Sequence, residues 1–166
     1  RRSEIIPVSG NLSIEDIIAE EEMVVTITHN GYIKRLPSST WRSQRRGGRG
    51  MKGAHTKEED FIEHLFTAST HDTMLFFTDR GKCYWMKVHE IPPGQRTSQG
   101  RAIVNLIICE PGEKVKAFVS VKEFNETDYI VMATRNGIIK RTSLSMYSRP
   151  RKGGIYAIEI RENDEL

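Results

Sequence analysis

Cysteine is scarce in this sequence, and its scarcity excludes two common architectures. Cys83 and Cys109 are the two cysteines, and they lie far apart in the chain. Small disulfide-stapled domains and paired zinc-ligand motifs both need several cysteines at short, regular spacings. The sequence therefore predicts neither a disulfide framework nor a zinc site, and it favours a reducing compartment.

Long apolar runs are missing as well. No run of about 18 apolar residues occurs, which argues against a membrane-spanning helix. Residues 1–10 lack the apolar core and the small-residue cleavage site of a secretory signal. Of the 166 residues, 37% are hydrophobic and 28% are charged, as is typical of a soluble globular domain. We therefore expect a cytoplasmic protein without a membrane partner.

Acidic residues are absent from two long windows of the chain, residues 23–57 and 129–158. Both windows are rich in lysine and arginine, and most acidic residues collect outside them. The net charge is only +3, so the distribution of charge is more informative than its sum. If the fold repeats in space, this segregation along the chain predicts a basic surface.

Three copies of a Thr-x-x-Gly motif mark an internal repeat of roughly fifty residues. The copies are Thr28–Gly31, Thr78–Gly81 and Thr134–Gly137, and each stands between two runs of strand-like composition. Asn-Gly at the first and third turns predicts a two-residue hairpin of type I′, which needs a positive φ at both central residues. A repeat of this size predicts a propeller-like array of small sheets.

Each repeat unit is predicted to hold about four strands. We group strands near residues 61–68 and 102–108 with the second hairpin, and strands at 114–121 and 155–160 with the third. A short helical turn is predicted where SIEDIIAEEE begins, with Ser13 as its cap. The predicted fold is all-β, an array of about three four-stranded blades that forms a partial ring after a helical turn.

A basic, glycine-containing loop follows each predicted hairpin at a similar distance. The loops read SQRRGGRG at 43–50, PGQRTSQG at 93–100 and SRPRKGG at 148–154. Arginine offers forked donors to phosphate oxygens, and glycine lets backbone N–H groups approach them. Contacts of this kind read no base sequence and weaken as salt rises. We expect the three loops to line one rim of the array and to bind a nucleic-acid backbone.

Two apparent nucleotide-binding motifs lack the context that they need. Residues 48–53 match G-x-G-x-x-G, but no helix is predicted after them. Ala54 and His55 stand where a P-loop needs Lys and Ser or Thr. The five histidines show no paired metal-ligand spacing, and no activated nucleophile stands out. We therefore predict no catalytic residue, no metal and no cofactor in this chain.

Three aromatic residues are candidates for stacking on bases or sugars. Trp41 flanks the first basic loop, where stacking and packing are equally well supported. Trp85 lies in a predicted strand, so core packing is its expected role, and Tyr147 precedes the third basic loop.

The heptapeptide QRRGGRG at residues 44–50 resembles the box that marks the C-terminal domain of the bacterial DNA gyrase A subunit. Its context is similar to the same family. IEDIIAEEEMVVTITHNGYIKR from Ile14 resembles the first blade, and KEEDFIEHLFTASTHD from Lys57 with GRAIVNLI from Gly100 resembles the second. MATRNGIIKRTSL and GGIYAIEI resemble the third.

The resemblance covers essentially the whole chain and implies its domain organisation. Residues 1–12 would be the tail of a preceding DNA-cleavage domain or a linker, and residues 13–166 would be a part of the C-terminal domain. The family fold is a β-pinwheel, a propeller-like ring or spiral whose blades exchange strands with their neighbours. About three of the family's roughly six blades would fall within this chain.

The resemblance also implies a function. The family wraps a DNA segment around its basic rim with positive handedness, so that strand passage introduces negative supercoils. Carried over, the DNA-binding box comprises Gln44, Arg45, Arg46, Gly47, Gly48, Arg49 and Gly50. A weaker basic rim is predicted from the loops and hairpins, and it comprises Lys34, Arg35, Lys52, Arg96, Arg101, Lys140, Arg141, Arg149, Arg151 and Lys152.

The implied partners are double-stranded DNA and the other parts of a heterotetrameric, ATP-dependent type II topoisomerase, namely the rest of the gyrase A subunit together with the gyrase B subunit. The cleavage tyrosine and the ATPase belong to those other parts, so the chain alone is not expected to be an enzyme, and ATP and Mg would act elsewhere. The expected location is the bacterial cytoplasm, at the nucleoid. Exposed strand edges of a partial array could also pair two copies of the chain.

Two other interpretations stay open. The related C-terminal domain of topoisomerase IV typically has a degraded box or none, so the intact heptapeptide argues against it. A propeller-type scaffold for protein interactions predicts no alignment of basic loops and no loss of affinity with salt.

Overall fold

The computed structural model of the chain describes residues 14–41 and 60–166. Within these two ranges the elements are strands and short 3₁₀ turns, and no α-helix is present. The predicted all-β class is confirmed. The strands are β1 (Glu22–Thr28), β2 (Tyr32–Pro37), β3 (Ile62–Ser69), β4 (Thr73–Thr78), β5 (Lys82–Lys87), β6 (Arg101–Ala102), β7 (Val115–Val121), β8 (Tyr129–Ala133), β9 (Ile139–Ser143) and β10 (Ile155–Tyr156).

A single 3₁₀ turn, η1 (Ile14–Asp16), stands where the sequence predicts a short helical turn. Ser13, its expected cap, lies outside the described residues. The other 3₁₀ turns of the described ranges follow strands, and they are η2 (Ser38–Thr40), η3 (Val88–Glu90), η4 (Ile103–Asn105) and η5 (Leu144–Tyr147).

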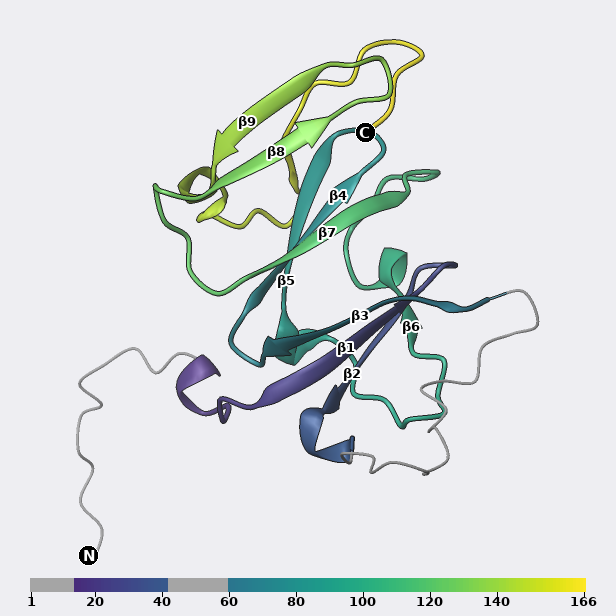
Figure 1. The fold of residues 1–166 in the computed structure, drawn as a ribbon, viewed down its shortest axis with the longest axis vertical. Helices are drawn as coiled ribbons and strands as arrows, with labels where there is room; N and C mark the ends of the chain where they lie inside the picture. Colours follow the sequence, from purple (N-terminus) through teal and green to yellow (C-terminus); the bar gives the residue numbers. More distant parts are fainter. Residues whose placement is uncertain (1–13, 42–59) are drawn as a thin grey trace, which may run out of the picture.

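The strands form three antiparallel sheets that follow one another along the long axis of the molecule (Figure 1). Sheet A has the strand order β3-β1-β2-β6, sheet B has the order β10-β5-β4-β7, and sheet C pairs β8 with β9. Each sheet is built on one of the three predicted hairpins. Sheets A and B have the predicted four strands, whereas sheet C has two within the described part of the chain.

Sheets A and B are each completed by strands from the following repeat unit. β3 pairs with β1, and β6 pairs with β2, so both belong to sheet A. β7 and β10 flank the second hairpin in the same way. The grouping of these strands with the second and third hairpins is wrong, because periodicity fixes a strand's place in the chain but not its pairing partner. The observed exchange is the one that the family resemblance implies.

Two of the predicted strands are shorter than expected. Of the predicted 102–108 segment, only Ala102 lies in a strand, β6 (Arg101–Ala102), since Ile103 N–H bonds to Gly31 O and the chain then turns into η4. The predicted 155–160 strand likewise ends at Tyr156, after which two successive N–H groups bond to Gly81 O. In both places the carbonyl oxygen of the hairpin glycine accepts a backbone N–H from the following unit, and the strand pairing ends there.

The hairpin turns differ from the predicted type I′ geometry. Gly31, Gly81 and Gly137 have φ values of +78°, +76° and +86°, but Asn163 is the one residue other than glycine with a positive φ in the described ranges. Each hairpin therefore has a connection longer than two residues, in which an ordinary turn is followed by a glycine in the left-handed region. The repeated threonine explains it, because its Oγ1 accepts the N–H of the residue after the glycine at 3.2 Å in all three hairpins.

An acidic residue from the following unit closes each turn. Asp60 Oδ1 accepts the backbone N–H of Asn30 at 3.0 Å, and Asp164 Oδ1 accepts that of Asn136 at 2.9 Å. At the second turn the buried Glu113 accepts the hydroxyl of the turn threonine at 2.6 Å. All three hairpins are thus tied to the chain that follows by a polar contact, and the first two are also tied to it by strand exchange.

Two buried clusters join the three sheets. The first lies between sheets A and B and includes Ile33 and Phe76, and the second joins sheet B to sheet C and includes Phe77 and Tyr147. β4 serves both clusters, because successive side chains of a strand point to opposite faces. The array is therefore a continuous packed core rather than three separate sheets.

Candidate nucleic-acid interface

The box at residues 44–50 and Lys52 lie outside the described residues. Their assignment to DNA binding stays a prediction from sequence. The structure does describe the second and third basic loops, residues 93–100 and 148–154, and the lysine-arginine pairs in β2 and β9.

The two described loops occupy equivalent places on successive sheets. Gly100 ends the second loop with φ +92°, and a Cβ on it would lie 2.4 Å from the carbonyl oxygen of Ile33 in β2. Gly154 ends the third loop with φ +72°, and its Cβ would lie 2.9 Å from the carbonyl oxygen of Cys83 in β5. Ile33 and Cys83 hold the same position after their hairpin glycines. Only glycine fits so close to strand backbone in this conformation, so each loop folds back on the hairpin of the preceding unit.

Most cations of these loops are exposed. Arg96 in the second loop and Arg101 just after it are exposed, and so are Arg149, Arg151 and Lys152 in the third. Exposed arginine and lysine side chains are the groups that most often contact phosphate oxygens.

Lys34 departs from the predicted rim. It is buried, and its ammonium Nζ donates to the carbonyl oxygens of Gln95, Arg96 and Ser98. Burial lowers the pKa of this lysine. The prediction of a surface cation at this position is wrong, because the side chain turns inward and binds the second loop.

The guanidinium of Arg35 also binds the following unit instead of standing on the predicted basic rim. Its Nε donates to Ile91 O at 2.7 Å and its Nη2 to His89 O at 3.0 Å. Trp85, the matching residue of the second hairpin, donates its Nε1 to Tyr147 O at 2.8 Å. Both contacts reach the 3₁₀ turn that follows the next hairpin, so this position joins neighbouring units whichever residue type occupies it.

The lysine-arginine pair of the third hairpin stays at the surface. Lys140 is exposed, and its Nζ donates to Ala157 O at 2.6 Å. Arg141 is exposed and lies over the Tyr129 ring, with its guanidinium carbon 4.3 Å from the ring centroid. Both side chains keep a charged surface, so they remain candidates for a phosphate contact.

A hollow of about 240 Å³ lies beside the third basic loop. Trp85 and residues 106–108 form an apolar floor, and Arg151 and Lys152 stand at its edge. The lining of the hollow combines the third loop with residues 106–108, which follow the second loop in the chain. Its cationic edge with an apolar floor is compatible with the sugar-phosphate face of a nucleic acid.

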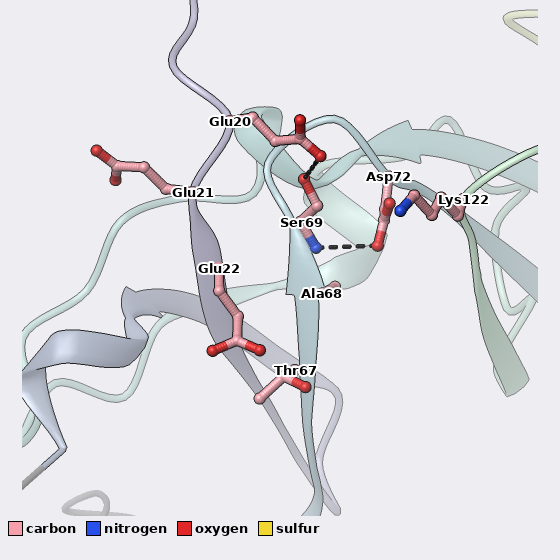
Figure 2. Close-up of a pocket in the computed structure, with 8 residues that line it drawn as sticks. All are labelled: Glu20, Glu21, Glu22, Thr67, Ala68, Ser69, Asp72 and Lys122. Atoms are coloured by element: carbon pink, nitrogen blue, oxygen red, sulfur yellow. Dashed lines mark hydrogen bonds between the residues drawn. The ribbon is translucent and has the colours of Figure 1, made fainter.

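An acidic hollow of about 340 Å³ lies where β1 begins and β3 ends (Figure 2). Figure 2 shows Ser69 between Glu20 and Asp72, with its hydroxyl donating to Glu20 at 3.3 Å and its N–H to Asp72 at 2.9 Å. Glu21 and Glu22 add to the negative lining. Lys122 adds one cation to the lining, but the carboxylates outnumber it and repel phosphate, so this hollow is an unfavourable place for a nucleic-acid backbone.

The aromatic candidates divide between core and surface. Tyr147 is 1% exposed and packs edge-on against Phe77, so the stacking role considered for it is wrong. Trp85 is partly buried against the second cluster, as the sequence predicts. Trp41 is partly exposed next to the undescribed segment.

No group of three or more His, Cys, Asp or Glu residues in the described ranges is arranged to hold a metal ion. Both cysteines are free thiols, and burial raises the pKa of Cys83 to about 12 and that of Cys109 to about 11. Among residues 14–41 and 60–166, no helix has the length and apolar character needed to cross a bilayer.

Comparison with known proteins places these repeats in a family. The family model described as DNA gyrase C-terminal domain, beta-propeller, matches residues 22–69, 72–106 and 128–166. The chain belongs to the DNA gyrase C-terminal domain family. Each matched segment contains one of the Thr-x-x-Gly hairpins, so the repeat found in the sequence is the repeat of this family.

Relatives named as the A subunit of DNA gyrase match the chain over its whole length. The protein of Neisseria gonorrhoeae is 51% identical over 166 residues, and that of Mycolicibacterium smegmatis is 45% identical over the same length. Both alignments cover 100% of this chain, but the chain spans only 18% and 20% of those two proteins.

Solved structures of gyrase-type C-terminal domains share the fold. A crystal structure of the C-terminal domain of DNA topoisomerase IV has a TM-score of 0.74 at 27% identity, covering 89% of this chain and 45% of that one. A structure of a DNA gyrase A C-terminal domain has a TM-score of 0.66 at 24% identity, covering 87% and 45%. The propeller-like architecture predicted from the repeat is thus confirmed.

Proposed function

We propose that this chain is a DNA-wrapping part of a bacterial DNA gyrase. It binds the backbone of double-stranded DNA without sequence preference and bends the duplex along its basic loops. In the assembled enzyme this wrap presents a DNA segment for strand passage, which then introduces negative supercoils.

One observation carries the proposal, namely the match of the whole chain, at 45% identity or more, to the A subunit of DNA gyrase in two different bacteria. The intact QRRGGRG sequence at residues 44–50 supports it from the chain's own chemistry. The equivalent placement of the second and third loops supports it further, since repeated loops that carry exposed cations can act on one continuous duplex.

The basic residues that we assign to DNA are the box and the exposed cations of the later loops. Lys34 and Arg35 leave the set because their side chains bind backbone carbonyls of the next unit. Lys52 remains with the box as a prediction from sequence. The set that remains is Gln44, Arg45, Arg46, Gly47, Gly48, Arg49, Gly50, Lys52, Arg96, Arg101, Lys140, Arg141, Arg149, Arg151 and Lys152.

The proposal extends to the assembly. The partners are the rest of the gyrase A subunit together with the gyrase B subunit, in the cytoplasm at the nucleoid. The chain supplies DNA binding and no catalytic residue, metal or cofactor of its own, while ATP and Mg serve other parts of the enzyme. Self-association of the chain is a further part of the proposal, because sheet C has two strands within the described residues and carries the exposed apolar residues Tyr129, Val131 and Ile139.

A topoisomerase IV C-terminal domain is the second candidate. The TM-score of 0.74 to such a domain favours it. The intact heptapeptide and the relatives named for DNA gyrase argue against it.

The test is binding of the full chain to random-sequence duplexes of increasing length across a salt series. Affinity should rise with duplex length and fall steeply with salt. Substituting Arg45, Arg46 and Arg49 together with alanine should weaken binding and flatten the salt slope by about 0.9 for every phosphate that is no longer neutralised. Unchanged affinity and slope in the folded triple variant would remove the box from the interface, and salt-independent binding would favour a protein scaffold instead.

A further inference from the structure

The second basic loop is organised by a buried lysine. Lys34 in β2 is 1% exposed. Its Nζ lies 3.2 Å from Gln95 O, 2.9 Å from Arg96 O and 2.7 Å from Ser98 O. These carbonyls belong to one turn of the loop, so the chain wraps around the ammonium much as it would around a bound cation.

The loop is shaped to admit the lysine stem. A Cβ on Gly94 would lie 2.8 Å from Ser98 Oγ and 2.9 Å from Lys34 Cδ, so any larger residue would push the lysine out of place. Gly94 N–H donates to Arg35 O at 3.0 Å, and Arg35 N–H donates to Pro92 O at 3.1 Å. The start of the loop is therefore fixed to β2 by both backbone groups of Arg35, the residue that follows the lysine.

The inward carbonyls turn other groups of the loop outward. No cis peptide bond occurs in the described residues, and in a trans peptide the N–H points opposite to the carbonyl of the preceding residue. Since Gln95 O and Arg96 O face Nζ, the N–H groups of Arg96 and Thr97 point away from it. Both residues are exposed. The exposed face of this turn is therefore the one that carries the Arg96 side chain, a group that binds phosphate oxygens.

The lysine is too deep to serve a ligand itself. A buried ammonium is tolerated only where acceptors replace the water that it loses. The three carbonyl oxygens supply those acceptors, and burial still lowers the pKa of the group. The ammonium therefore stabilises the loop through its carbonyl oxygens and is not available to a ligand at the surface.

We propose that Lys34 is a positioning residue for DNA, because its buried ammonium holds loop 93–100 in the shape in which Arg96 contacts a backbone phosphate. This inference rests on the proposed function. Lys34 itself does not touch the duplex.

The test compares the full-length chain with Lys34→Met, Arg96→Ala and the double variant, in salt-series binding to one random-sequence duplex. Arg96→Ala should weaken binding several-fold and lower the salt slope by about 0.9. In the Lys34→Met background the same substitution should add little, because the loop no longer presents the arginine. Additive losses are expected if Lys34 acts on folding alone.

Limited trypsin cleavage after Arg96 gives an independent readout of the loop. Cleavage should accelerate in Lys34→Met and return toward the wild-type rate in Lys34→Arg, which restores several donors to the carbonyls. Lys116→Met is the matched control, since it removes one exposed charge from β7, away from the loop, and should leave this cleavage unchanged.

Gly94→Ala keeps the inference testable if Lys34→Met does not fold. Its Cβ displaces the lysine stem without removing a charge, so it should also cancel the effect of Arg96→Ala. Equal losses from Arg96→Ala in all backgrounds, or unchanged cleavage in the folded Lys34 variant, would overturn the role of Lys34. A wild-type chain that fails to bind the duplex would overturn the proposed function instead.

Discussion

At the scale of single residues, one hydroxyl joins two repeat units. Thr78 is fully buried, and its Oγ1 donates to Glu113 at 2.6 Å while it accepts the N–H of Lys82 at 3.2 Å. Glu113 also accepts the hydroxyl of Tyr84 at 2.9 Å. The turn threonine is therefore part of a buried polar network, and a network of this kind is costly to leave half satisfied.

Thr78→Val should lower the free energy of unfolding by about 2–3 kcal/mol, because a buried carboxylate loses a donor and a buried N–H loses its acceptor. Thr28→Val is the matched control. Thr28 accepts one N–H, from Tyr32, and no donation to a carboxylate is described for it, so its loss should be about 1 kcal/mol. Urea unfolding of both variants measures the difference, and equal losses would contradict the network.

The two thiols should be unreactive at neutral pH. Burial raises the pKa of Cys109 to about 11 and that of Cys83 to about 12. The thiolate is the reactive form, so at pH 8 a disulfide reagent should modify the partly buried Cys109 roughly a hundredfold more slowly than an ordinary thiol. Its rate should rise about tenfold per pH unit toward pH 11.

Cys109→Ser should remove the faster phase of that reaction and leave the slower phase of the buried Cys83.

The raised pKa of the thiols also sets the sign of their effect on stability. The unfolded chain loses its thiol protons first as pH rises, so the free energy of unfolding should fall between the ordinary thiol pKa and pH 11. Fast modification of both cysteines at pH 8 would contradict the burial.

The sequence alone does not show which basic side chains bind the protein itself and which stay at the surface. Lys34-Arg35 and Lys140-Arg141 follow equivalent glycines and look the same in sequence. The first pair binds carbonyls of a following unit, whereas the second stays at the surface. The direction of a lysine depends on whether acceptors surround it, and those acceptors lie some sixty residues away in the chain.

At the scale of elements, the loops depend on glycines that meet strand backbone. Gly100→Ala should be more destabilising than Gly137→Ala. Both have a positive φ, which costs an alanine about 1–2 kcal/mol. At Gly100 the new Cβ would also meet Ile33 O at 2.4 Å, whereas at Gly137 nothing lies within 4 Å.

The added overlap should increase the loss for Gly100→Ala by about 1–3 kcal/mol. Denaturant unfolding of the two variants gives the comparison. Equal losses would mean that the second loop does not pack on β2 as described.

The hairpins could be predicted from the sequence, but the strands that pair with their outer edges could not. Thr-x-x-Gly between two apolar runs predicts a turn wherever it occurs, because the turn is a local structure. The pairing of β3 with β1 depends on contacts between units, and no local pattern encodes it. The turn type also escaped prediction, since Asn-Gly favours type I′ while the threonine side chain favours the longer connection. The acids Asp60, Glu113 and Asp164, which close the turns, were visible only as residues that recur after each basic loop.

At the scale of the whole molecule, strand exchange and repeated loops act together. The second and third units supply strands to the preceding sheet, and their loops pack on the preceding hairpin. A duplex that follows successive loops would therefore bend around a fixed array instead of contacting separate modules. The box residues 44–50 belong to the same series in sequence, and they carry the densest positive charge.

The central claim is tested most directly by the linking number of DNA. A nicked circular duplex is ligated in the presence of increasing amounts of the chain, and the topoisomers are then separated. The account predicts a shift toward positive linking number that grows with bound protein and is lost in the Arg45, Arg46 and Arg49 triple variant. An unchanged distribution on a saturated circle would contradict DNA wrapping by this chain, and a negative shift would contradict the positive handedness that the family resemblance implies.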